Sequence, residues 1–144
     1  CARKNQAWRN ALAAGALIFN SFSLPADARP AIEVLQDTTR CVATYDAAHK
    51  AAELSGQKPT VERFAREQNN WRTLLATLAQ LIMAGRNLSV VPDIRHSIAN
   101  IYEEQFRLVI NSVAANDGML LTRMHDRCKK LADEVRNAIT PPGD

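Results

Sequence analysis

The chain has 144 residues, of which 47% are hydrophobic and 23% charged, proportions that are typical of a globular domain and argue against disorder. Its 5 glycines and 6 prolines exclude a collagen-like or low-complexity sequence. The formal net charge is +3, but three basic residues lie within the first nine positions, and charges of both signs alternate along the rest of the chain. Nucleic-acid-binding domains concentrate lysine and arginine on one face, so we expect no nucleic-acid partner.

Residues 1–28 have the three parts of a secretory signal peptide. These are a basic start (Arg3, Lys4 and Arg9), a short apolar run (11–19), and small residues at the two positions that an export peptidase reads (Ala26 and Ala28). The apolar run is too short to cross a bilayer, which takes roughly 20 residues in a helix. We therefore expect cleavage after residue 28, a single domain over 29–144 without a stable membrane span, and a periplasmic or secreted protein.

The sequence leaves two other interpretations of this segment open. Residues 1–28 can instead form an ordinary amphipathic helix. The chain begins with Cys1 rather than methionine, which is compatible with a fragment boundary, a processed end or a lipid-modified cysteine. A lipid anchor would leave a basic and apolar stretch directly behind it, so we rank this interpretation last.

Removing the signal peptide leaves two cysteines, Cys41 and Cys128, in a chain bound for an oxidising compartment. That setting favours a disulfide between them, and the alternative is two separate buried thiols, which behave as small hydrophobic side chains. A bond that closes so long a loop is worth about 4–5 kcal/mol in the chain-entropy model. The sequence contains no C-x-x-C, so a thioredoxin-type redox site and covalent c-type haem attachment are unsupported.

Four stretches of the chain place apolar residues three and four positions apart, the spacing of one face of a helix. Proline, glycine, asparagine and aspartate mark their limits, which are in chain order Pro30 and Gly56, Pro59 and Gly85, Pro92 and Asn116, and Asp117 and Pro141. We expect Thr60 to cap the second helix and Asp117 to cap the fourth. A kinked continuation from the third helix into the fourth, through Gly118, is the alternative.

The four helices predict an all-α, antiparallel up-down-up-down four-helix bundle, because short links join helices of similar length. The apolar stripe of the third helix is Ile94, Ile98, Ile101, Gln105, Leu108 and Ser112. Gln68 and Gln105 are polar residues within such stripes, and we expect them to set the register of packing. The register also puts Cys128 about 6 Å along the helix axis from the level of Cys41, so the disulfide is predicted to join the first helix to the last.

The same register brings His49, Met124 and His125 to one height in the bundle. Imidazole and thioether groups are suitable ligands for haem iron or a transition metal. The simpler interpretation is that these residues pack or hydrogen-bond without a ligand, so we expect no cofactor. A haem- or metal-binding bundle that uses His49 with Met124 or His125 remains the alternative.

A second apolar strip runs beside the stripe of the third helix, at Tyr102, Phe106, Val109 and Val113. A helix with two apolar flanks faces either more of its own bundle or another molecule. The strip is therefore a candidate surface for a protein partner or for self-association, and packing within the monomer is the alternative.

The sequence has none of the motifs that mark a nucleophile elbow, a zinc protease, a phosphate-binding loop or a dinucleotide site. We therefore favour a non-enzymatic function. The sequence predicts an exported helical bundle that serves as a binding or structural module and presents a helical surface, at 102–113, to a protein partner in the cell envelope. The cofactor-binding bundle is the competing function, and an enzyme without a recognised motif is a third.

Overall fold

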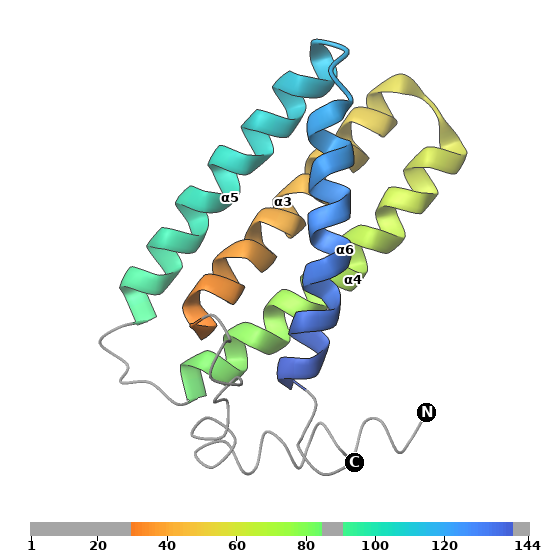
Figure 1. Ribbon diagram of the computed structural model, residues 1–144. Helices are drawn as coiled ribbons and strands as arrows, with labels where there is room; N and C mark the ends of the chain where they lie inside the picture. Colours follow the sequence, from red (N-terminus) through yellow and green to blue (C-terminus); the bar gives the residue numbers. More distant parts are fainter. Residues whose placement is uncertain (1–29, 85–90, 140–144) are drawn as a thin grey trace.

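The computed structural model describes residues 30–84 and 91–139, which form four helices. They are α3 (Ala31–Ser55), α4 (Lys58–Ala84), α5 (Val91–Ala114) and α6 (Met119–Ile139). Successive helices run in opposite directions, so the fold is the predicted antiparallel up-down-up-down bundle (Figure 1). The predicted signal peptide, 1–28, lies outside the described residues. None of the four helices is both long enough and apolar enough to span a membrane.

Local backbone geometry sets both ends of α3. Pro30 precedes the first turn, and its carbonyl accepts hydrogen bonds from the N–H groups of Glu33 and Val34. Gly56 ends the helix in the left-handed conformation, with a φ of 71°. Glycine adopts this conformation without the steric cost that a Cβ atom brings, so the predicted end of the first helix is confirmed.

The predicted cap of the second helix is wrong, because α4 begins two residues before Thr60. The carbonyl of Gln57 accepts the N–H of Val61 at 3.0 Å, and Pro59 lies in the first turn, where its missing N–H leaves no bond unmade. The hydroxyl of Thr60 donates to the side chain of Gln57 at 3.4 Å and does not bind a backbone N–H.

The turn between α5 and α6 confirms the predicted break. Asn116 adopts a left-handed φ of 57°, and the N–H groups of Asn116 and Asp117 donate to the carbonyls of Val113 and Ser112. This pair of bonds is the Schellman arrangement that commonly closes a helix. The carboxylate of Asp117 then accepts the N–H of Met119 at 3.1 Å, so Asp117 caps α6 as predicted.

The first helix, α3, lies at the centre of the bundle. It packs against α4, α5 and α6, whereas α4 and α5 make almost no contact with each other. All eight residues of 41–48 are buried, which requires neighbours on every side of α3. Ala43, Ala47 and Ala48 supply the small side chains that let those neighbours approach closely.

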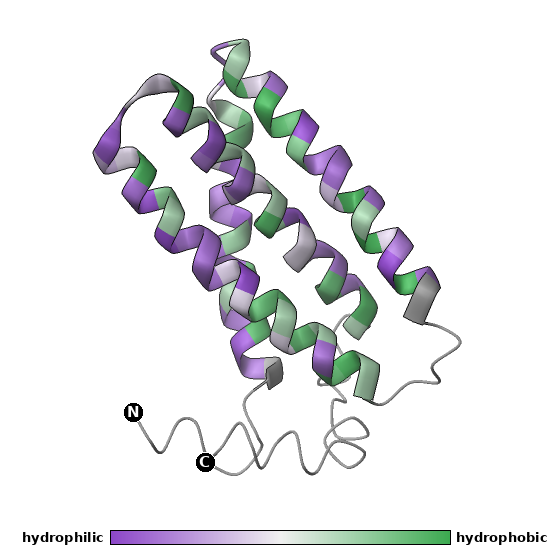
Figure 2. Ribbon diagram, turned by 180° about the vertical axis from the view of Figure 1, so that it is seen from behind, coloured by the Kyte–Doolittle hydropathy of each residue, from purple (hydrophilic) through white to green (hydrophobic). Residues whose placement is uncertain are grey.

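The apolar core draws on all four helices. Its largest buried members are Val34, Leu35, Val42, Tyr45, Trp71, Leu78, Ile82, Ile94, Met124, Leu131 and Val135. The first half of α4 is hydrophilic and its second half hydrophobic (Figure 2). Because Leu78 and Ile82 lie in that second half and pack with residues from the start of α3, the core is apolar at this end of the bundle. The other end of α3 carries the polar contacts described below.

One predicted core position is wrong. Leu108 is 50% exposed, and its neighbour Val109 is fully buried in its place. The sequence offers two consecutive apolar residues here, and adjacent residues on a helix point about 100° apart. Gln105 and Val109, one turn apart, both face inward, so Leu108 turns outward.

The predicted disulfide between Cys41 and Cys128 is confirmed. It joins the middle of α3 to the middle of α6, with the two Cα atoms 5.7 Å apart. Both cysteines are buried, so the bond lies within the core and links the first and last helices of the bundle.

Candidate functional site

Asp46 is a carboxylate of α3 that lies inside the bundle, where only 6% of it is exposed. From α4, Gln68 Nε2 donates to Oδ1 at 2.8 Å and Arg72 Nη2 lies 3.0 Å from Oδ1. From α5, the hydroxyl of Tyr102 donates to Oδ2 at 2.6 Å. Asp46 therefore links α4 and α5, two helices that hardly touch each other, through the central helix.

A second polar contact ties α5 to α3 one turn further along α5. Gln105 is buried, and its Nε2 donates to the hydroxyl of Thr44 at 3.1 Å, while that hydroxyl donates to the carbonyl of Arg40. Gln68 and Gln105 both donate hydrogen bonds to side chains of α3. Their role in setting the register stays a prediction. No side-chain nitrogen or oxygen buried within 30–84 and 91–139 lacks a hydrogen-bond partner.

The contact with Asp46 fixes an aromatic pair on α5. Burial, followed by the hydrogen bond to Asp46, raises the pKa of Tyr102 to about 12, so its hydroxyl remains a donor at neutral pH. The ring of Phe106 stacks on that of Tyr102 at 6.0 Å between centroids. The pair is half-buried, and it lies on the side of α5 from which Tyr102 reaches Asp46.

The structure divides the apolar strip that the sequence singles out. Val109 is fully buried and packs within the monomer, so it offers no surface to another molecule. Tyr102, Phe106 and Val113 are half-buried, which leaves part of each side chain accessible. The candidate partner surface is therefore the Tyr102–Phe106 pair together with Val113, which we call the α5 strip.

Tyr45, the residue before Asp46 on α3, meets His125 of α6. The Tyr45 hydroxyl and His125 Nδ1 are joined by a hydrogen bond of 2.7 Å, and the two rings are nearly perpendicular. Trp71 stacks against the Tyr45 ring. Burial raises the pKa of Tyr45 well above its ordinary value, and the charge of Glu67 raises it further. The pair borders an open pocket of about 260 Å³ that is lined by residues of α3, α4 and α6.

The three predicted ligand residues occupy separate places. His49 lies 3.8 Å from Glu53 of its own helix, and His125 is bonded to Tyr45. Met124 is buried in the core beside the disulfide. Within the described part of the chain, no three His, Cys, Asp or Glu side chains are grouped so that they could hold a metal ion. The haem or metal site remains a prediction from the sequence alone.

Comparison of the chain with protein-family models, with curated proteins and with solved structures found no match. The inferences that follow therefore rest on this chain's own geometry.

Two contacts were not predicted from the sequence. The apolar stripe predicted for the first helix does not include Asp46. A charged residue inside the run 41–48, which is otherwise free of charge, nevertheless indicates a buried carboxylate that needs partners. The bond between Tyr45 and His125 had a weaker signal. The predicted register puts His125 at the height of His49, whereas it lies against Tyr45, so the predicted height is wrong by about one turn of α3.

Proposed function

We propose that this protein is an exported, non-enzymatic binding module that presents the α5 strip to a protein partner in the cell envelope. The observation that carries this proposal is the stacked pair of Tyr102 and Phe106, part of which is accessible and which is held in place by Asp46. Binding through this surface requires no rearrangement of the bundle.

Partly exposed aromatic rings are effective at protein interfaces because they bury much apolar area with few rotatable bonds. The hydrogen bond to Asp46 orders the ring of Tyr102 before a partner arrives, so little conformational entropy is lost on binding. Glu103 and Arg107 are exposed next to Phe106 along the helix and supply the polar rim that surrounds such contacts.

Two features support export. The first is the predicted signal peptide at 1–28. The second is the disulfide between Cys41 and Cys128, since disulfides persist in oxidising compartments and are rare in a reducing cytosol.

Site-specific photocrosslinking in living cells tests the proposal. A photoreactive amino acid replaces Phe106, and in a matched chain it replaces Glu104, an exposed residue on the far side of α5. We expect a discrete adduct with another protein from position 106 and none from position 104. The variant Phe106→Ser should compete poorly for the same partner while the protein keeps its helical content. Equal labelling from both positions, or no discrete adduct from position 106, would contradict the proposal.

A further inference from the structure

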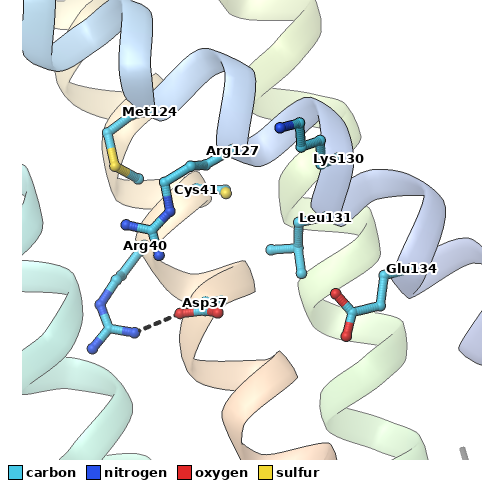
Figure 3. A pocket seen from close by; sticks show the side chains of 8 residues that line it. All are labelled: Asp37, Arg40, Cys41, Met124, Arg127, Lys130, Leu131 and Glu134. Atoms are coloured by element: carbon cyan, nitrogen blue, oxygen red, sulfur yellow. Dashed lines mark hydrogen bonds and ion pairs between the residues drawn. The ribbon is translucent and has the colours of Figure 1, made fainter. Parts of the chain in front are cut away.

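A separate pocket of about 240 Å³ opens between α3 and α6, beside the disulfide (Figure 3). The helix α6 contributes Met124, Arg127 and Leu131, among others, and α3 contributes Arg40 and Cys41. This pocket shares no residue with the α5 strip or with the pocket at Tyr45 and His125, so a ligand here is independent of the proposed function.

Positive charge dominates one end of this pocket. Arg127 and Lys130 lie at the end nearer Met124, whereas the acidic residues Asp37 and Glu134 line the opposite end together with the Arg40 guanidinium (Figure 3). Arg40 is bonded to Asp37 at 2.7 Å. Arg127 and Lys130 have no ion-pair partner among residues 30–84 and 91–139, so their charges are available to a ligand.

The wall behind these cations is apolar and fixed in position. Met124 and Leu131 are each 6% exposed, and Cys41 contributes its side chain from the disulfide. The covalent link between α3 and α6 holds the two sides of the pocket together. An apolar wall next to unpaired cations favours a ligand with an anionic head and an apolar body, because each part then meets a complementary surface.

We propose that this pocket binds a small amphiphilic anion, a carboxylate or phosphate ester whose apolar body lies against Met124 and Leu131 while its charge is held by Arg127 and Lys130. A volume of 240 Å³ is the volume that about eight water molecules occupy in liquid water. It is below the roughly 300–1,000 Å³ of pockets for drug-sized molecules. A ligand of the size of octanoate therefore fits the pocket.

Calorimetric titration of the oxidised protein with sodium octanoate, below its micelle-forming concentration, tests the proposal. We expect saturable binding of octanoate, much weaker binding of acetate, which lacks the apolar body, and no binding of octylammonium, which carries the opposite charge. The double variant Arg127→Gln/Lys130→Gln should bind octanoate at least about tenfold more weakly, since it loses both charged contacts.

The matched control is Arg95→Gln/Lys129→Gln, which removes two exposed positive charges that do not line the pocket. It should bind octanoate as the unmodified protein does. Circular dichroism checks that both double variants fold, which we expect because all four side chains are exposed. Equal binding of octanoate and octylammonium, or an equal effect of the two double variants, would overturn the assignment. So would binding to phosphatidylglycerol vesicles without saturable binding of octanoate, because the cations would then serve a lipid surface rather than a pocket.

Discussion

Asp46 shows how one buried charge can organise a small bundle. Its two oxygens accept hydrogen bonds from Gln68 and Tyr102, and Oδ1 also forms an ion pair with Arg72. These partners come from two helices that otherwise stay apart. A carboxylate in this position is favourable only while its partners remain, because an unpartnered buried charge is strongly destabilising. The sequence reveals the charge within an apolar helix, but it does not reveal the partners, since these lie 22 to 56 residues away along the chain.

The variant Asp46→Asn tests this role at nearly constant volume. An amide offers one acceptor oxygen where the carboxylate offers two, so at least one of the three donors loses its acceptor. We expect the free energy of unfolding to fall by about 1–3 kcal/mol in urea denaturation. The control is Asp133→Asn, which alters a carboxylate that is 83% exposed, and it should change stability by less than about 0.5 kcal/mol. Equal effects of the two variants would show that Asp46 has no special role.

The two tyrosines predict a pH dependence in the alkaline range. Burial raises the pKa of both, to about 12 for Tyr102 and higher for Tyr45, whereas tyrosines in the unfolded chain ionise near 10. The folded state holds these protons more tightly than the unfolded chain. The stabilisation is therefore complete below pH 10 and is lost as the pH rises through 10 toward 12 and above.

Absorption of the tyrosinate ion measures this titration directly. We expect no step near pH 10 in the folded protein, a first ionisation near 12 from Tyr102, and a later one from Tyr45. The variant Tyr102→Phe should remove the earlier step only. Ionisation of either tyrosine near its ordinary value, while the circular dichroism is still that of the folded protein, would mean that its ring is not buried as described.

Individual helices were predictable to different degrees. The limits of α3 and the break before α6 follow from residues with strong local preferences, Gly56 and the pair Asn116 and Asp117. The predicted start of α4 is wrong because proline fits any position of a first turn, so Pro59 does not fix the register of that turn. The predicted core position of Leu108 is wrong because the three-and-four spacing fits Leu108 and Val109 about equally well, and packing against α3 selects Val109.

The two described glycines form a matched pair for testing helix ends. A Cβ atom at either Gly56 or Gly118 would meet no other atom within 4 Å, but only Gly56 has a positive φ, of 71°. Gly56→Ala should therefore lower the free energy of unfolding by about 1 kcal/mol, purely through the backbone. Gly118→Ala should be neutral or slightly stabilising, because it restricts the unfolded chain at no steric cost. Thermal denaturation of both variants decides this, and a larger loss from Gly118→Ala would contradict the assignment.

At the scale of the whole molecule, the bundle and its disulfide were predictable, whereas the central position of α3 was not. Four amphipathic stretches with short links leave few topologies to consider. The central helix has to let three other helices approach it closely. In α3 the alanines of 43–48 allow this, because their small side chains leave room for α4, α5 and α6. The candidate partner surface was predictable only in outline. Val109 is buried and does not belong to it, and a hydrogen bond anchors Tyr102 to Asp46.

The disulfide should be the largest single contribution to stability. It closes a loop between residues 87 positions apart, which corresponds to about 4–5 kcal/mol in the chain-entropy model. We expect Cys41→Ser/Cys128→Ser to remain helical by circular dichroism and to unfold at much lower denaturant concentration. Adding a reductant should destabilise the unmodified protein to the same level and leave the double variant unchanged. An unchanged denaturation midpoint after reduction would show that the bond is absent or contributes nothing.

We propose that the chain leaves the cytosol and forms its covalent link between α3 and α6 outside it. Intact-mass analysis of the protein isolated from cells, with and without reduction, tests this most directly. We predict an N-terminus at Arg29 and a mass lower, by the two hydrogens that a disulfide removes, than that of the reduced chain. A protein that retains residues 1–28 and carries free thiols at both Cys41 and Cys128 would contradict it.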